Sequence, residues 1–272
     1  MQKKLSKYVS FKLSTNVSLL SENEKKMLPI LIKAASYMND LFWFEAYGNK
    51  KELLKNVTDD DTKKFIEINY GPWDRLDGNK PFVDGVGERP LGSNYYPSNI
   101  SKEEFEAFSD ENKTSLYTFI RRDSNGKLIS VPYYKKFESV VKEVSKLLLE
   151  ASLLAEDEGL KKYLELRSQA FLNDNYQASD LAWMEMKTNT LDIVVGPIET
   201  YEDQLFGFDA YLVSDWEENY HVSMVGDSNN QQVAYKSVAQ GYMDSVNIVL
   251  PKGVKYADLS FVIADSTYEL EH

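Results

Sequence analysis

Apolar residues recur at helical spacing over three stretches of the chain, and this periodicity constrains the fold more strongly than any other feature of the sequence. The first helix is predicted to follow a capping box formed by Ser21 and Glu24 and to end near Gly48, with Pro29 as a kink or a restart. Its buried stripe is predicted to comprise Leu28, Leu31, Ile32, Ala35, Met38 and Phe42. The other two stripes belong to two helices with a predicted break at Gly159. The first stripe comprises Val140, Val141, Val144, Leu147, Leu148, Ala151 and Leu154. The second comprises Leu160, Tyr163, Leu164, Leu166 and Phe171.

Shorter elements are predicted between and after these helices. Residues 52–68 indicate short helices around an exposed turn at Asp59–Asp61, which lacks the glycine and the spaced ligands of a calcium loop. Ser101 and Glu104 form a second capping box. Residues 115–134 are typical of a β-hairpin, with its turn at residues 123–126. Residues 179–189 predict a short capped helix or turn, and the apolar run at residues 191–196 predicts a strand.

The pattern changes after about Tyr211, where alternating and β-rich runs follow one another to the end of the chain. We therefore predict an α+β protein in which a mainly helical lobe with a β-hairpin and short strands precedes a strand-rich C-terminal part. The predicted domains are residues 1–211 and residues 212–269. Residues 270–272 are interpreted as the remnant of an affinity tag.

Composition excludes several classes of function. A formal net charge of −12 argues against nucleic acid or an anionic membrane as the main partner. The absence of cysteine excludes disulfides and thiolate zinc sites. No apolar run approaches the roughly 20 residues of a membrane span, and the basic start lacks the apolar stretch of a signal peptide. A soluble protein is expected, and the sequence leaves its compartment open between the cytoplasm and the periplasm.

One long stretch, Tyr70 to Pro97, is predicted to be irregular because it carries five glycines and four prolines. Loops of this length in compact proteins are often functional. The stretch also retains Trp73, Phe82, Tyr95 and Tyr96, which favour an ordered segment that wraps around the helices. The sequence leaves both interpretations open.

Candidate chemistry gathers at one strand end. The strand that leads into Gly196-Pro197 is followed by Glu199, Tyr201, Glu202 and Asp203. The acidic residues could cap a helix that begins near Glu202, or Glu199 and Asp203 could form an acid/base pair like that of a glycosidase. A third interpretation is recognition, in which a carboxylate binds a substrate ammonium and Tyr201 donates to a carbonyl.

A complete hydrolytic site is not predicted within this chain. Apart from the tag-like His272, the only histidine is His221, which lies in a strand-like run, and no His-Glu-x-x-His motif is present. A Ser-His-Asp triad would also depend on His221, and the sequence contains no Gly-x-Ser-x-Gly motif. We therefore assign no catalytic, cofactor-binding or metal-binding residue from these patterns.

Three strings resemble bacterial members of the dipeptidyl peptidase III family, the M49 zinc peptidases. They are "DLFWFEAYG", "INYGPWDRLDGNKPFVDGVGERPLGSNYYP" and "GPIETYEDQLFGF", in the order expected of the amino-terminal lobe, and the resemblance covers about residues 8–211. It implies a lobe that binds peptide across a cleft from a second, helical lobe that holds zinc. The match to the family's Gly-x-x-Glu-x-Tyr motif implies that Glu199 binds the peptide's amino end and that Tyr201 binds its backbone.

The same resemblance implies that the zinc lobe is absent from this chain, so that zinc is expected only in the full-length protein. The expected partners are a peptide substrate and the missing lobe. Beyond residue 211 the resemblance ends, because the family continues there with helix. Two other functions remain open at this stage: a noncatalytic binding or interaction protein that reuses the lobe, and a metal-independent carboxylate enzyme such as a glycosidase.

Overall fold

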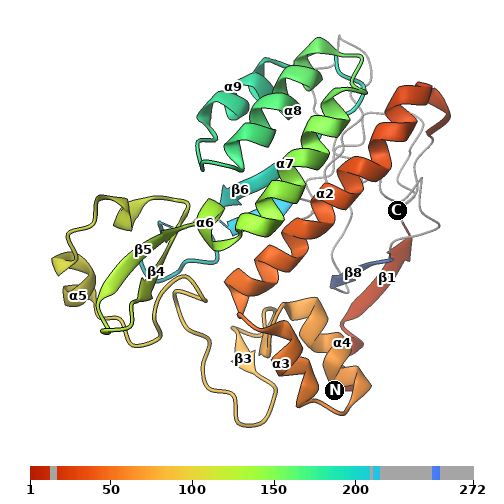
Figure 1. Ribbon diagram of the computed structural model, residues 1–272. Helices are drawn as coiled ribbons and strands as arrows, with labels where there is room; N and C mark the ends of the chain where they lie inside the picture. The colour runs from red at the N-terminus through yellow and green to blue at the C-terminus, as the bar shows by residue number, and fades with distance from the viewer. Residues whose placement is uncertain (13–16, 209–210, 215–246, 252–272) are drawn as a thin grey trace. The chain divides into compact units, whose positions relative to one another are not determined.

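A computed structural model describes residues 1–12, 17–208, 211–214 and 247–251. Helices dominate these residues and the strands form small two-stranded pairs, which confirms the predicted α+β class (Figure 1). The chain divides into two compact units. The first comprises the described parts of residues 1–7, 39–137 and 197–213, and the second those of residues 8–38, 138–196 and 214–272.

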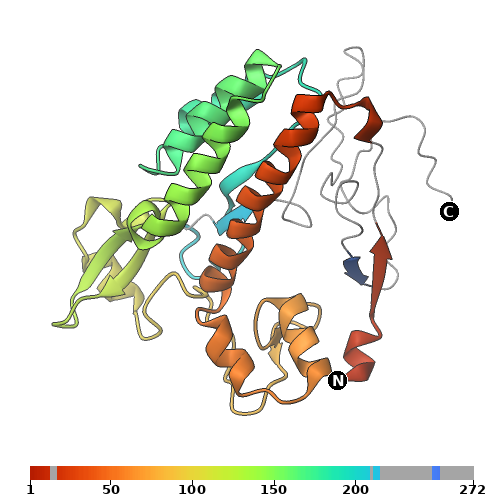
Figure 2. The ribbon, with the colours of Figure 1, turned by 45° about the vertical axis from the view of Figure 1, so that its right-hand side comes forward.

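Three helices of the second unit lie side by side: α7 (Glu138–Ser152), α8 (Glu158–Ala170) and α9 (Gln177–Glu185) (Figure 2). Their predicted stripes are largely confirmed, since Val144, Leu148, Tyr163 and Leu164 are fully buried. The position of Gly159 was predicted wrongly. Helix α8 already begins at Glu158, because the Asp157 side chain accepts a hydrogen bond from the Leu160 amide at 2.8 Å and caps the helix there.

Helix α2 (Glu22–Ala46) begins at the predicted capping box, in which Ser21 Oγ accepts from the Glu24 amide at 3.1 Å and Glu24 accepts from the Ser21 amide at 2.8 Å. The helix continues through Pro29 without a restart, and its residues up to Met38 belong to the second unit. The predicted stripe is buried except for Ile32, which is partly exposed.

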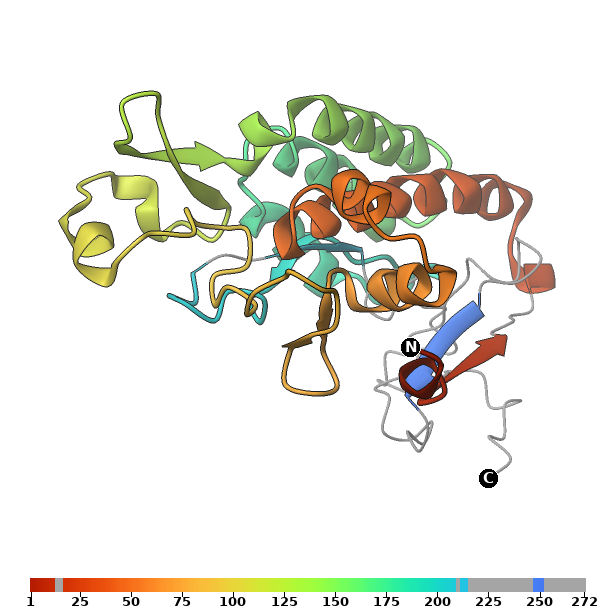
Figure 3. The ribbon, with the colours of Figure 1, turned by 90° about the horizontal axis from the view of Figure 1, so that it is seen from below.

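The same unit contains a short 3-10 helix, η1 (Val17–Leu19), and the antiparallel pair of β1 (Tyr8–Lys12) and β8 (Asn247–Pro251), visible in Figure 3. Strand β8 falls within one of the predicted C-terminal β-rich runs. The remaining predicted strands beyond residue 214 lie outside the described residues, so the domain boundary near residue 211 and the β-rich module stay predictions.

The apolar run at residues 191–196 is mostly not a strand. Strand β6 is Val195–Glu199, and it pairs with β7 (Tyr211–Ser214). The residues before it, 191–193, are buried in an irregular conformation. Side-chain hydrogen bonds fix them there: Trp183 Nε1 donates to Asp192 at 2.8 Å, and Asn189 donates to the Leu191 carbonyl at 2.9 Å. The predicted strand is therefore displaced toward the candidate motif.

In the first unit, short helices surround an apolar cluster. Helices α3 (Lys50–Lys55) and α4 (Asp60–Asn69) are capped by Asn49 and Asp59, which confirms the predicted helices around an acidic turn. The cluster comprises Trp43, Leu53, Val57 and Ile66, with Tyr47, Leu54, Tyr70, Phe82 and Val83 packed against it. Helix α1 (Gln2–Leu5) and the two-residue strands β2 (Trp73–Asp74) and β3 (Lys80–Pro81) complete this region.

The predicted hairpin is confirmed as β4 (Thr118–Arg122) and β5 (Leu128–Pro132), antiparallel with Ile120 opposite Ser130. Ser101 caps α5 (Lys102–Ala107) as predicted, and the Glu104 carboxylate binds both Nη atoms of Arg122, at 2.6 and 2.8 Å. Two further short helices follow α5 and the hairpin: η2 (Glu111–Thr114) and α6 (Tyr133–Lys136).

The Ser21 cap provides a test of how α2 is stabilised. Ser21→Ala removes the acceptor for the Glu24 amide, so the free energy of unfolding should fall by about 0.5–2 kcal/mol in urea titrations. Ser36→Ala is the matched control, because Ser36 is exposed inside the same helix and donates only to the Lys33 carbonyl. Equal effects of the two substitutions would show that the cap does not stabilise the helix start.

Candidate functional site

The candidate cluster at the end of β6 splits into exposed and buried members. Glu199 is the last residue of β6, and its side chain lies outside the described part of the structure. Tyr201 follows in a turn, with 72% of its surface exposed, whereas Glu202 and Asp203 are buried at 5% and 4%. The four residues therefore do not form one continuous acidic surface.

Glu202 is held by two arginines of the long 70–97 segment. Its Oε1 forms an ion pair with Arg75 Nη1 and its Oε2 with Arg89 Nη2, while Ser93 Oγ donates to its backbone carbonyl at 3.0 Å. Burial lowers the pKa of Arg89; the neighbouring Glu202 carboxylate opposes this shift, and Arg75 adds to it. Glu202 is thus a buried counter-ion that joins two distant segments.

Asp203 organises the turn that follows. Its Oδ1 accepts from the amides of Leu205 and Phe206 at 3.0 and 3.2 Å, and its Oδ2 accepts from the Phe208 amide at 2.8 Å and from Tyr96 Oη at 2.7 Å. These amides belong to a turn, so the interpretation that a helix begins near Glu202 is wrong. Because both oxygens of buried Asp203 are occupied, this carboxylate is a poor candidate for the glycosidase-like pair with Glu199.

The 70–97 segment is an ordered wrapping segment. Tyr95 and Tyr96 are buried, and the Leu91 carbonyl accepts the Gln204 amide at 2.8 Å. A Cβ on Gly92 would lie 2.4 Å from the Tyr96 ring, so only glycine permits this close packing. The segment carries the side chains that contact Glu202 and Asp203.

Aromatic side chains continue the contact beyond Asp203. The ring of Phe206 stacks on Phe105 of α5 with centroids 4.2 Å apart and meets Tyr96 edge-on at 5.0 Å, and Phe208 stacks on Phe105 at 6.0 Å. Phe206 and Phe208 of the "LFGF" part are therefore half-buried packing residues, whereas Leu205 is exposed. Their ring contacts join the turn after Tyr201 to α5 within the first unit.

Sequence patterns missed the partners that determine this arrangement. Arg75, Arg89, Ser93 and Tyr96 lie in an irregular segment more than 100 residues away from Glu202 and Asp203. Only the abundance of aromatic residues in that segment signalled that it is ordered.

Metal ligands do not gather within the described residues, where no group of three or more His, Asp or Glu side chains could hold an ion. His221 and His272 both lie outside this part of the chain. In the same described ranges, no helix combines the length and the apolar character needed to cross a membrane.

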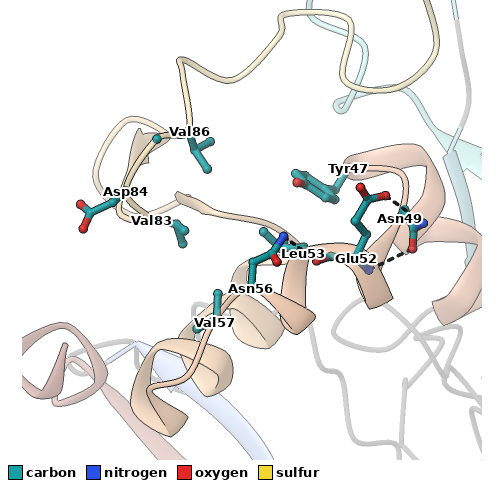
Figure 4. A pocket seen from close by; sticks show the side chains of 10 residues that line it. Tyr47, Asn49, Glu52, Leu53, Asn56, Val57, Val83, Asp84 and Val86 are labelled. Carbon is teal, nitrogen blue, oxygen red and sulfur yellow. Dashed lines mark hydrogen bonds between the residues drawn. The ribbon is translucent and has the colours of Figure 1, made fainter.

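A separate hollow of about 460 Å³ lies between α3 and residues 83–86 (Figure 4). Leu53, Val57, Val83 and Val86 give it apolar walls, but its two carboxylates do not converge, because Asp84 points away from Glu52. Neither Glu199 nor Tyr201 lines this hollow. It offers Glu52 as a carboxylate of the same unit that lies outside the predicted motif.

The solved structures that are similar to this chain include two of dipeptidyl peptidase III. The chain is similar to dipeptidyl peptidase III from Caldithrix abyssi, with a TM-score of 0.74 and 35% identity over 78% of this chain and 42% of that chain. It is also similar to dipeptidyl peptidase III from Corallococcus sp. strain EGB, with a TM-score of 0.71 and 33% identity over 77% of this chain and 42% of that chain. Most of the chain is therefore a dipeptidyl peptidase III-like segment, which confirms the resemblance inferred from the motifs.

A curated relative carries a different name. Nudix hydrolase 3 of Arabidopsis thaliana is 30% identical over 277 aligned residues, which cover 77% of this chain and 35% of that protein. The chain thus spans about a third of the curated relative and less than half of the two solved structures. No protein-family model matches the chain.

The hydrogen bond from Tyr96 to Asp203 can be tested by stability measurements. Tyr96→Phe removes a hydroxyl bonded to a buried carboxylate, so the free energy of unfolding should fall by about 1–3 kcal/mol. Tyr201→Phe removes an exposed hydroxyl and should change it by less than about 0.5 kcal/mol. Urea denaturation of both variants measures the difference. A Tyr96→Phe variant as stable as wild type would show that this bond does not stabilise the turn.

Proposed function

We propose that this chain is the peptide-binding lobe of a dipeptidyl peptidase III-like metallopeptidase whose catalytic zinc is bound by another part of the full-length protein. The observation that carries the proposal is the similarity to two dipeptidyl peptidase III structures over 77–78% of the chain. The described residues offer no set of zinc ligands, so the ligands are assigned to a part of the protein outside them. The Nudix name is not carried over, because that relative is matched in sequence alone and over 35% of its length, whereas the two dipeptidyl peptidase III chains match in both fold and sequence.

In this proposal Glu199 and Tyr201 hold the amino end of the peptide. A carboxylate at the end of β6 would bind the terminal ammonium through a charge-assisted hydrogen bond, worth about 1.5–3 kcal/mol. The exposed hydroxyl of Tyr201 can donate to a backbone carbonyl of the peptide. Binding the amino end at a defined distance from the metal would set how many residues are removed.

The burial of Glu202 and Asp203 supports this assignment of roles. Both carboxylates are occupied by protein groups, so neither has a free oxygen edge for a substrate ammonium. Of the four acidic or phenolic residues at this strand end, Tyr201 is the one whose described side chain is exposed to solvent. Glu199 is assigned from the motif alone.

Zinc content and turnover separate a peptidase lobe from a noncatalytic binding protein. We expect the full-length protein to contain about one equivalent of zinc per chain and to release dipeptidyl arylamides, and the 272-residue chain to do neither. Elemental analysis and a chromogenic assay measure the two properties. A full-length protein without zinc and without turnover would contradict the peptidase and favour the binding protein.

Substitution of the two motif residues in the full-length protein tests peptide binding. Glu199→Ala should raise KM for peptides with a free amino terminus by about 10-fold or more, and Tyr201→Phe by a smaller factor, because each loses a hydrogen bond to the substrate. Glu52→Gln is the control, since it removes a carboxylate of the same unit that lies at the separate hollow. Wild-type kinetics in both motif variants would remove the pair from the binding site, and a raised KM in Glu52→Gln would place peptide binding at the hollow instead.

A further inference from the structure

Neighbouring residues of the turn after β6 have opposite environments: the side chain of Tyr201 is exposed, and that of Glu202 is buried against two arginines. We propose that Glu202 is a positioning residue, which through Arg75 and Arg89 holds the turn so that Tyr201 is presented to the peptide. This inference rests on the proposed function and adds a role for a residue that does not itself contact substrate. We call Glu202, Arg75 and Arg89 the Glu202 cluster.

The side chain and the backbone carbonyl of Glu202 are both bound by residues of the 70–97 segment. Each carboxylate oxygen pairs with a different guanidinium, and the backbone carbonyl accepts from Ser93 Oγ at 3.0 Å. Ser93 in turn accepts a hydrogen bond from Arg89 Nη2 at 2.9 Å. A residue held by its side chain and by its main chain cannot rotate freely, so the backbone beside Tyr201 has a defined direction.

The two arginines are also fixed by contacts other than those with Glu202. Arg75 Nε donates to the Asn69 carbonyl at 2.8 Å, its backbone amide donates to Asn69 Oδ1 at 2.9 Å, and its guanidinium lies 5.6 Å from the centre of the Phe42 ring. Asn69 is the last residue of α4, so Arg75 connects the end of this helix to the turn that carries Glu202. The side chain of Arg89 is only 8% exposed, which restricts it by packing.

Charge explains why this contact responds strongly to substitution. One carboxylate compensates two guanidinium groups, and removing one partner of a buried pair leaves uncompensated charge in a poorly hydrated place. A neutral side chain at position 202 would therefore release the turn from the arginines. The next residue would still hold the following amides, because Asp203 bonds Leu205, Phe206 and Phe208 independently of the Glu202 cluster.

A positioned tyrosine binds more tightly than a mobile one because less conformational entropy is lost when the peptide arrives. The consequence is a specific kinetic signature. Loosening the turn should weaken peptide binding and leave the reacting atoms unchanged, so KM should rise while kcat stays near wild type.

The test uses Glu202→Gln in the full-length protein, with Glu52→Gln as the matched carboxylate-to-amide control. Hydrogen exchange measured by mass spectrometry should accelerate about tenfold or more in residues 200–204 and 89–94 of Glu202→Gln and remain at wild-type rates in α7. KM for a peptide with a free amino terminus should rise roughly threefold to tenfold, with kcat within about twofold of wild type. Glu52→Gln should match wild type in both measurements.

Glu202→Asp keeps the experiment decisive if the glutamine variant does not fold. The shorter side chain retains the charge but cannot span both guanidinium groups, so exchange and KM should take intermediate values. Unchanged exchange at residues 200–204 would overturn the inference, and so would faster exchange with an unchanged KM. Glu199→Ala and Tyr201→Phe, measured beside it, report on the proposed function separately: if they raise KM and the Glu202 variants do not, only the positioning role fails.

Discussion

The structure around the candidate site depends on one buried carboxylate that compensates two arginines. Glu202 is 127 residues from Arg75 and 113 residues from Arg89, so this interaction closes a long loop of chain, and the ion pairs help to offset the conformational entropy that closure costs. Breaking it would remove the carboxylate that compensates the buried guanidinium of Arg89. This cluster therefore fixes the turn after β6 to the wrapping segment at residues 70–97.

This constraint also decides which side chains remain available for chemistry. Four acidic or phenolic residues follow the glycine-proline pair at the strand end, but the carboxylates of Glu202 and Asp203 are occupied by Arg75, Arg89, Tyr96 and main-chain amides. Two buried acids on one side of the turn leave Tyr201 on the other, exposed side. The acidic cluster is thus mainly a structural anchor beside an exposed tyrosine, and this division supports the proposed peptide binding better than acid/base catalysis.

The sequence predicted those features that depend on local chemistry. The Ser21 cap, the stripe along α7 and the hairpin turn at residues 123–126 arise from neighbours within a few residues, so periodicity and turn composition identify them. The partners of Glu202 depend on a contact across more than a hundred residues, and no local pattern marks Arg89 as buried. The start of β6 was misplaced for a related reason: the apolar run at residues 191–196 reflects burial, which a strand and an irregular segment share.

The most direct test of this account is a crystal structure of the full-length protein with a slowly cleaved peptide bound. We expect Tyr201 Oη within hydrogen-bond distance of a backbone carbonyl of the peptide, the Glu199 carboxylate at its terminal ammonium, and Glu202 still paired with Arg75 and Arg89. A peptide bound at the hollow beside α3, or one whose ammonium displaces the arginines from Glu202, would contradict the account.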